Sequence, residues 1–280
     1  MEDKLLKEFI RNSLEEDLGD GDHSSLASIP AESQGKAKLL VKQAGIIAGM
    51  RVASAVFSYI DPKVGFKSFI EDGSAIKPGD IAFVVEGNVH SILKSERLVL
   101  NIMQRMSGIA TSTHEYADKL KGLKTKILDT RKTSPGLRFL EKEAVRIGGG
   151  MNHRMGLYDM IMLKDNHIDY AGGIEKAILR TDEYLKKNKL NLKIEIEARS
   201  IQDIEKIIST GGVDRIMLDN FSIENTIAAV KLINGRFETE SSGGITIDTI
   251  RSYAECGVDY ISVGALTHHI KSLDMSLKAF

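Results

Sequence analysis

Charged side chains follow a series of short apolar segments in the second half of the chain, and their types indicate what they bind. The first segment, "TKILDT", leads directly into Arg131 and Lys132. The second segment has His153 and Arg154 shortly before it and Lys164 at its end. Clustered cations of this kind suit a ligand that carries more than one carboxylate or phosphate. We therefore expect these residues to bind a small molecule with several negative charges.

The later segments carry different chemical groups. Glu195 and Asp219 supply carboxylates, which suit Mg²⁺ or a pair of ribose hydroxyls. Ser242, Gly243 and Gly264 lie where we expect helices to start, and exposed N–H groups at a helix start bind phosphate. Together the segments predict a site for a multi-anionic small molecule and a metal-bound sugar phosphate.

Each feature also has an ordinary structural explanation. Arg131 and Lys132 could lie in a solvated loop, and either Glu195 or Glu197 could simply pair with Lys164. The segment "GDGDHSS" lacks the glycine and the distal glutamate of an EF-hand loop, so we expect no calcium there. What favours a functional site is that the polar residues recur at the ends of successive segments.

Alternating strands and helices must position these residues. Strands are predicted at 125–130, 160–166, 192–198, 215–220, 237–244 and 260–265, and helices at 135–147, 173–187, 200–209, 222–233 and 246–256. Ser134 is the predicted cap of the first of these helices, and Gly148 its end. Strict alternation favours a parallel sheet, and its chemistry is expected at the carboxyl ends of the strands. Because six strands are predicted rather than eight, we expect an open or incomplete (β/α) barrel.

The pattern of predicted elements in the first half of the chain indicates a separate domain with both helices and strands. Its elements are predicted as a helix ending near Gly19, strands at 36–43 and 64–73, and a helix at 50–60. Two more strands are expected to meet in a hairpin at Gly87-Asn88, with a long helix from Ser95. The predicted fold is thus α/β, with an N-terminal α+β sandwich domain at 1–110, the barrel at 111–270, and a C-terminal tail at 271–280 that can pack back on the N-terminal domain.

Composition excludes several classes of protein. The net charge of −1 argues against nucleic-acid and membrane-surface partners, which usually require a surplus of Lys and Arg. The one cysteine, Cys256, excludes an internal disulfide framework and a Cys-rich zinc site. There is no apolar run fit for a signal peptide or a membrane span. We therefore expect a cytoplasmic protein.

The stretch "DTRKTSPGLRFLEKEAVRIGGGMNHRMGLYDMIMLKDNH" closely resembles the signature of the quinolinate phosphoribosyltransferases, also called carboxylating nicotinate-nucleotide pyrophosphorylases. The blocks "EEDLGDGDHSS", "SERLVLNIMQRMSGIAT", "MLDN", "ESSGGI" and "GVDYISVGALTH" follow in that family's order. The resemblance covers nearly the whole chain. Departures are small: His23 and the serines after it replace a more usual Ile-Thr-Thr, and Leu98-Val99 stand where Thr-Ala is commoner.

The resemblance implies an enzyme that transfers the phosphoribosyl group of phosphoribosyl pyrophosphate to quinolinate. Decarboxylation accompanies the transfer and gives nicotinate mononucleotide, pyrophosphate and CO₂ in de novo NAD biosynthesis. The resemblance also implies Mg²⁺ as cofactor and a homodimer, with higher oligomers left open. In that dimer Arg97 reaches into the neighbouring subunit's site.

The resemblance further assigns roles to individual residues. The expected quinolinate-binding residues are Arg131, Lys132, His153, Arg154 and Lys164, and those for the 5′-phosphate are Ser242, Gly243, Gly264 and His268. Glu195 and Asp219 fall in the ribose and Mg²⁺ region, with direct or indirect metal binding left open. The expected catalytic residues are Lys132, Lys164, Glu195 and Asp219.

Three alternatives have different chemistry. A paralogue from molybdate-uptake operons shares the fold, with a different or unknown substrate, but should lack the full "GGGMNHR" and "LKDNH" blocks. A biotinyl carrier needs a modifiable lysine at the hairpin tip, where this chain has Gly87-Asn88. A nicotinate-using phosphoribosyltransferase is usually longer and needs no cations for a second ring carboxylate. The paralogue is the main alternative.

Overall fold

The structure, a computed structural model, describes residues 2–280, with side chains from residue 4 onwards. The chain forms two compact units, each with its own sheet. Unit 1 contains the chain up to His114 together with Ser134–Gly149 and His269–Phe280. Unit 2 contains Glu115–Thr133 and Gly150–His268. The chain therefore passes between the units more than once.

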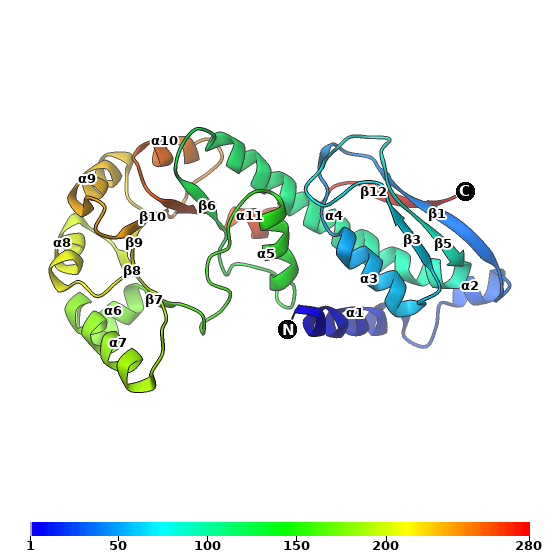
Figure 1. Ribbon diagram of the computed structural model, residues 1–280, viewed down its shortest axis with the longest axis horizontal. Helices are drawn as coiled ribbons and strands as arrows, with labels where there is room; N and C mark the ends of the chain where they lie inside the picture. The colour runs from blue at the N-terminus through cyan, green and yellow to red at the C-terminus, as the bar shows by residue number, and fades with distance from the viewer. Residues whose placement is uncertain (1) are drawn as a thin grey trace. The chain divides into compact units, whose positions relative to one another are not determined.

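Unit 1 is built on a four-stranded antiparallel sheet in the order β12-β1-β5-β3. Its strands are β1 (Gln34–Val41), β3 (Gly65–Ser68), β5 (Ile81–Asn88) and β12 (Met275–Ala279), and a small separate pair joins β2 (Gly45–Ile46) to β4 (Ala75–Ile76). Its helices are α1 (Glu2–Leu18), α2 (His23–Ser28), α3 (Met50–Ile60), α5 (Arg138–Ile147) and α4 (Val89–Lys119), which ends in unit 2 (Figure 1). Phe57 of α3 packs on Phe83 of β5 and Phe66 of β3, which fixes helix to sheet.

Two local predictions in unit 1 are wrong for identifiable reasons. Gly87 and Asn88 do not turn a hairpin, because Asn88 Oδ1 accepts a hydrogen bond from the Ser91 N–H and thereby starts α4. Ser134 does not cap α5: its hydroxyl accepts instead from the guanidinium of Arg105, 2.8 Å away, and the helix begins at Arg138. The predicted end of that helix, at Gly148, is confirmed.

The segment "GDGDHSS" has a structural role in the described chain. Asp22 is the N-cap of α2, and its carboxylate accepts a hydrogen bond from the Ser25 N–H at 3.1 Å. That bond satisfies one of the helix's exposed donors.

Unit 2 is an open barrel built from six parallel strands in the order β6-β11-β10-β9-β8-β7. The strands are β6 (Lys126–Leu128), β7 (Ile161–Leu163), β8 (Ile194–Ala198), β9 (Arg215–Asp219), β10 (Glu238–Ser242) and β11 (Tyr260–Ser262). The first and last strands of the sheet, β6 and β7, do not pair, so the barrel stays open between them. The predicted six-stranded, incomplete barrel is therefore confirmed.

Helices cover the outer side of this curved sheet (Figure 1). They are α6 (Asp165–Ala171), α7 (Ile174–Asn188), α8 (Ile201–Thr210), α9 (Ile223–Ile233) and α10 (Ile250–Glu255), while the short α11 (Ala265–His268) follows β11. Serine caps start two of them: the Ser200 hydroxyl accepts from the Asp203 N–H in α8, and Ser222 does the same for Asn225 in α9. Such caps contribute about 1 kcal/mol each. Among residues 2–280, no helix combines the length and apolar character needed to cross a membrane.

Candidate active site

A pocket of about 700 Å³ opens at the carboxyl ends of the six strands of unit 2. Every strand contributes to its wall, either directly or through the loop that follows it. Of the residues that the sequence assigned to the site, those that line the pocket are Arg131, Lys132, His153, Arg154, Lys164, Asp219, Ser242, Gly243, Gly264 and His268. The parallel sheet thus brings together side chains that are far apart in the sequence.

Two of the assigned residues do not line this pocket. Arg97 lies in unit 1, on an exposed face of α4. Glu195 is the second residue of β8, and its side chain is fully buried. Glu197, two residues nearer the carboxyl end of the same strand, lines the pocket instead.

The cations of the pocket are held close together in a partly desolvated wall. Arg154 is buried, and its Nη1 donates to the carbonyl of Met160 at 3.2 Å. Burial, together with repulsion from the Arg131 guanidinium, lowers the pKa of Arg154. Like charges that are held together in this way create a positive potential, and an anion that enters the pocket relieves it.

Lys164 and Glu197 form an ion pair at the ends of two adjacent strands. The Lys164 Nζ lies 3.1 Å from Glu197 Oε1, while Glu197 Oε2 accepts from the Asp165 N–H at 3.0 Å. Glu197 therefore fixes both the side chain of Lys164 and the start of α6. The sequence allows either Glu195 or Glu197 to pair with Lys164, and the structure identifies Glu197.

Glycines form the opposite wall, after β10 and β11. Gly243 and Gly244 have φ angles of 98° and 61°, and a Cβ at Gly243 would overlap the side chain of Asn220. They lie in a loop, because α10 begins only at Ile250, so the prediction that they start a helix is wrong. Consecutive backbone N–H groups in such a turn still form a concave anion-binding surface.

Gly264 allows close packing between the last strand and the first. A Cβ on Gly264 would lie 2.9 Å from the ring of His268 and 3.1 Å from Lys132 Cδ. The hydroxyl of Thr267 donates to the carbonyl of Lys132 at 2.8 Å, which ties the loop after β6 to α11. Lys132 and His268 are therefore brought to the same side of the pocket.

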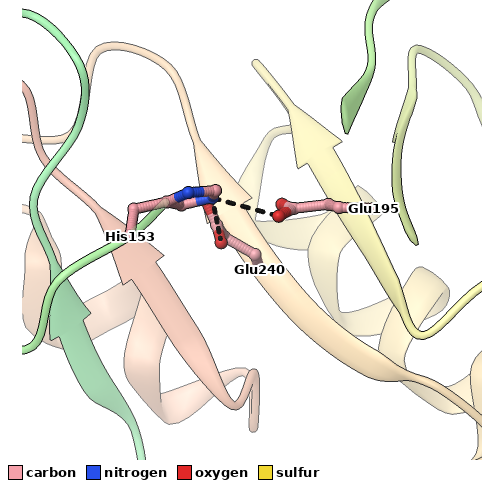
Figure 2. Close-up of side chains that lie close together, drawn as sticks. All are labelled: His153, Glu195 and Glu240. Carbon is pink, nitrogen blue, oxygen red and sulfur yellow. Dashed lines mark ion pairs between the residues drawn. The ribbon is translucent and has the colours of Figure 1, made fainter. Parts of the chain in front are cut away.

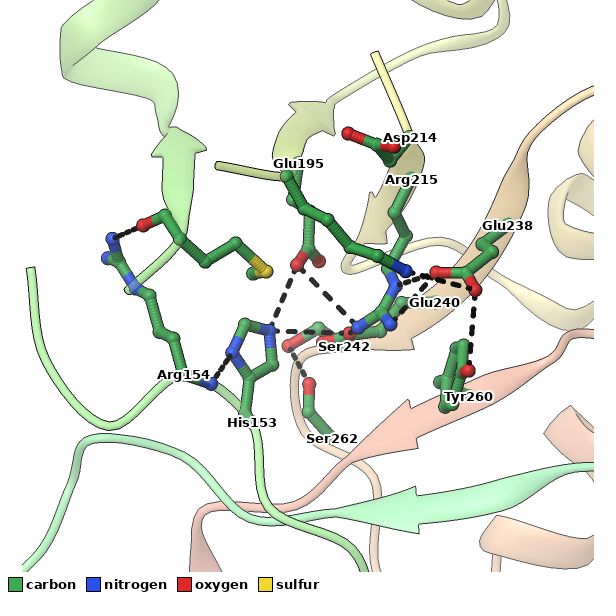
Figure 3. Close-up of polar contacts among 12 residues, drawn as sticks. His153, Arg154, Glu195, Asp214, Arg215, Glu238, Glu240, Ser242, Tyr260 and Ser262 are labelled. Atoms are coloured by element: carbon green, nitrogen blue, oxygen red, sulfur yellow. Dashed lines mark hydrogen bonds and ion pairs between the residues drawn. The ribbon is translucent and has the colours of Figure 1, made fainter. Parts of the chain in front are cut away.

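At the floor of the pocket, which His153 and Glu240 help to line, His153 meets two buried carboxylates, Glu240 and Glu195 (Figure 2). Its Nε2 lies 3.0 Å from Glu195 Oε2 and 3.4 Å from Glu240 Oε2. Arg215 of β9 joins the same cluster, with its Nη1 2.9 Å from Glu240 Oε2 and 3.7 Å from Glu195 Oε2 (Figure 3). The sequence did not single out Arg215 or Glu240. The sequence signal that could have identified them is a charged residue in each of two mostly buried strands, Arg215 in β9 and Glu240 in β10.

The cluster shifts the protonation of its members. Burial and repulsion from Glu240 raise the pKa of Glu195 to about 7, so Glu195 takes up a proton before Glu240 does. Burial opposes a charge on His153, but the contacts with Glu195 and Glu240 outweigh it and raise the pKa of His153 to about 9. The buried carboxylates therefore keep His153 protonated at neutral pH, and Glu195 is partly protonated there.

The expected pair of Mg²⁺ ligands can be tested against these positions. Glu195 is opposite Arg215 in the β8–β9 register, and Asp219 is four residues further along β9, about 13 Å away at roughly 3.3 Å per residue. One ion cannot contact both carboxylates. Because Glu195 faces His153 and Arg215, it does not fit a Mg²⁺ ligand. Asp219 lines the pocket and fits an ion that keeps waters and substrate phosphates as its other ligands.

Comparisons with known proteins agree over almost the whole chain. The family described as quinolinate phosphoribosyl transferase matches with its N-terminal domain at residues 22–107 and with its C-terminal domain at 109–278. A Nicotiana tabacum protein named quinolinate phosphoribosyltransferase (decarboxylating) 2b, mitochondrial, is 46% identical over 288 aligned positions, which cover 98% of this chain and 82% of that protein.

Solved structures give the same result. The nicotinate-nucleotide pyrophosphorylase from Francisella tularensis matches with a TM-score of 0.93 at 37% identity, covering 99% of this chain and 96% of that chain. NadC from Streptococcus pyogenes matches with a TM-score of 0.91 at 42% identity, covering 96% and 94% of the two chains. This chain therefore belongs to the quinolinate phosphoribosyltransferase family.

Proposed function

We propose that this protein transfers the phosphoribosyl group of phosphoribosyl pyrophosphate to quinolinate and releases pyrophosphate and CO₂, giving nicotinate mononucleotide for de novo NAD biosynthesis. The observation that carries the proposal is the pocket in which Arg131, Lys132, Arg154 and Lys164 converge opposite a glycine loop. A pyridine dicarboxylate and a sugar phosphate together require this combination of fixed cations and exposed backbone N–H groups.

The cations position the nucleophile. Arg131, Arg154 and Lys164 come from the loop after β6, the loop before β7 and the end of β7, so they approach a bound dicarboxylate from different elements. Holding both carboxylates leaves the ring nitrogen free to point at C1 of the sugar. Fixing two reactants in this way contributes several kcal/mol to the barrier reduction.

Carboxylates and cations act on the charges that develop as the C1–oxygen bond breaks. Asp219 and Glu197 line the pocket and stabilise positive charge on the sugar ring. Lys132, close to Gly264 and His268, stabilises negative charge on the phosphates. Asp219 is the carboxylate that would hold Mg²⁺ at this pocket, where the ion would supply further charge neutralisation to the leaving pyrophosphate.

Loss of CO₂ then follows from the new bond. Once the ring nitrogen is bonded to C1 it carries a positive charge, which stabilises the electron pair left on the adjacent ring carbon when CO₂ leaves. That carbon takes up one proton to give nicotinate mononucleotide. The protein's part in this step is placement, and no covalent enzyme intermediate is required.

We also propose a homodimer in which Arg97 reaches the partner's pocket. Exposed apolar side chains in the segment between Arg154 and β7 support it, because Leu157 and Tyr158 are 72% and 71% exposed in the single chain. Contiguous apolar side chains on a surface mark contact sites, and most soluble oligomers are homo-oligomers with closed symmetry. Arg97 is an exposed cation on α4 and is not among the residues that line the pocket of its own chain.

A direct assay tests the proposed reaction. Purified protein is incubated with quinolinate, phosphoribosyl pyrophosphate and Mg²⁺ while nicotinate mononucleotide and CO₂ are followed, and nicotinate replaces quinolinate in a parallel reaction. We expect product from quinolinate alone, because the pocket cations hold two carboxylates. If neither reaction gives product, the molybdate-operon paralogue with a different substrate becomes the better assignment.

A further inference from the structure

The interior of the barrel beneath the pocket contains charges where side chains of a barrel core are usually branched and apolar. Glu195 and Glu240 are fully buried, and Arg215 of the strand between them is largely so. Removing such groups from water is costly, and well-packed apolar residues would often be at least as stable. Stability alone therefore does not explain this cluster.

What the cluster encloses is the ring of His153. The His153 N–H donates to Asp129 Oδ1 at 2.8 Å, which fixes the backbone. On the ring, Nε2 faces Glu195 and Glu240, while Nδ1 accepts a hydrogen bond from the Arg154 N–H at 2.7 Å (Figure 3). Both ring nitrogens therefore lie against polar groups of the protein itself, although the residue lines the pocket.

These contacts select one tautomer. Carboxylates only accept hydrogen bonds, so the ring nitrogen that faces them carries a proton. Nδ1 faces a donor, so in this arrangement Nδ1 carries none. Neutral His153, the form present above its pKa of about 9, is thus held as the Nε2–H tautomer, and below that pKa the ring keeps the Nε2 proton and gains a second one on Nδ1.

We infer that Glu195 and Glu240 are positioning residues that act through His153: they hold its Nε2 proton and thereby fix the orientation in which the ring forms part of the pocket wall. That this wall belongs to the quinolinate site rests on the proposed function. The orientation itself does not depend on any substrate. Outer groups that orient a histidine in this way typically change activity by about 10- to 100-fold when they are removed.

The same atoms could be considered for a metal ion. The ligand atoms of His153, Glu195 and Glu240 lie within 4.8 Å of one another. Arg215, however, already supplies positive charge to both carboxylates and stacks on the ring of Tyr260, with 4.0 Å from its Cζ to the ring centroid. A divalent ion would have to enter beside this guanidinium, and we therefore assign the cluster to positioning.

The first test reads the tautomer directly, without substrate. Nitrogen NMR of protein labelled with ¹⁵N-histidine separates protonated from unprotonated ring nitrogens, and a His153→Gln variant assigns the signal. We expect His153 to carry its proton on Nε2 once the ring is neutral. A neutral His153 with its proton on Nδ1 would overturn the inference, and this result needs no variant of the cluster to fold.

Variants then separate positioning from general stabilisation. Glu195→Gln and Glu240→Gln should each weaken the tautomer preference, because an amide offers a donor as well as an acceptor to Nε2. The matched control is Glu238→Gln: Glu238 binds Arg215 at 3.0 Å, as Glu240 does, but lies at the amino end of β10, two residues before Glu240, so the tautomer of His153 should persist. If only Glu238→Gln loses the preference for the Nε2–H tautomer of His153, the positioning role of Glu195 and Glu240 is contradicted.

A double-mutant cycle gives the kinetic test. Glu240→Gln should lower kcat/KM for quinolinate by about 10- to 100-fold, and in a His153→Ala background it should have no further effect beyond about 2-fold. Full additivity of the two changes would mean that Glu240 acts independently of His153, against the inference. If no variant or wild-type protein has activity, the proposed function fails while the tautomer measurement still decides the positioning role.

Titration with Zn²⁺ is the remaining control. We expect the His153 ring signals to be unchanged by Zn²⁺ at neutral pH, since Arg215 and the Nε2 proton occupy the cluster. A shift of the Nε2 signal that is lost in Glu240→Gln would show a metal site and overturn the assignment.

Discussion

Lys164 and Glu197 face each other across adjacent strands, with 3.1 Å between Nζ and Oε1, and the pair stands at the carboxyl edge of the barrel. Glu197 holds Lys164 in place while its other oxygen accepts from the first N–H of α6. A flexible lysine is thereby made into a fixed cation. Because β7 and β8 are neighbours in the sheet, their pairing places Lys164 and Glu197 together at the pocket.

This relationship predicts the effect of removing Glu197. Glu197→Ala should lower kcat/KM for quinolinate by about 10-fold or more, because Lys164 loses its orienting partner. Asp169→Asn is the matched control, since Asp169 pairs with Arg199 outside the pocket at 2.8 Å and should leave the kinetics unchanged. Equal losses of kcat/KM in both variants would show that breaking any ion pair lowers activity, and would contradict a specific role for Glu197.

The loop after β6 should be essential for turnover. Arg131→Ala and Lys132→Ala should each lower kcat by about 100-fold or more, as does the loss of other preorganised electrostatic groups. The control is Lys206→Ala, which removes an exposed lysine from the outer helix α8. Its kcat should be close to that of the wild-type protein. Steady-state kinetics with both substrates checks this, and near-normal turnover of the two pocket variants would exclude a role for Arg131 and Lys132 in holding the substrates.

Gly243 should matter for the phosphate-bearing substrate. Gly243→Ala places a Cβ against Asn220 in a backbone with φ 98°, so it should raise KM for phosphoribosyl pyrophosphate by about 10-fold and change KM for quinolinate much less. Gly235→Ala is the matched control, because Gly235 has φ 71° with open space around it. The control should lose about 1–2 kcal/mol of stability, the usual cost of a left-handed backbone for a residue with a Cβ. If both variants raise KM for phosphoribosyl pyrophosphate to a similar extent, the cause is backbone strain in general and not the position of Gly243 at the pocket.

Stability should fall as pH rises through the range in which His153 titrates. The pKa of His153 is raised from 6.5 to about 9, so its contribution is fully present below about pH 6.5 and is lost as pH approaches 9. The raised pKa of Glu195, about 7, acts in the same direction between pH 4.5 and 7. Urea unfolding at pH 6.5 and 9 measures the difference. His153→Gln should reduce this pH dependence, and an unchanged pH dependence in that variant would contradict the assignment.

Mixing two inactive variants tests the contribution of Arg97. If Arg97 completes the partner's pocket, Arg97→Ala and Lys132→Ala subunits assembled together form one pocket that has both residues intact. About a quarter or more of the activity per dimer should return in a mixed dimer of proven composition. Without such rescue, Arg97 acts within its own chain or not at all.

Much of the fold was predictable because its signals are local. The six strands of unit 2 are short apolar runs, and the helices between them have caps or buried faces within a few residues, as Ser200 and Ile204 in α8 illustrate. Alternation of this kind leaves few arrangements other than a parallel sheet. Most site residues followed from the same logic, because the carboxyl ends of parallel strands meet at one edge.

Tertiary structure decided the rest. Glu195 and Glu197 are identical in type and face the same side of β8, yet one is buried against His153 and the other holds Lys164. Only depth along the barrel, and the residues that other strands place at each depth, separates the two roles. Asn88 is similar: it begins a helix instead of a turn, and its side chain also donates to the carbonyl of Ala31, 57 residues away. The amino-acid sequence determined which chemical groups were available, and long-range packing determined which of them meet, because contact energies depend on neighbours that no local pattern specifies.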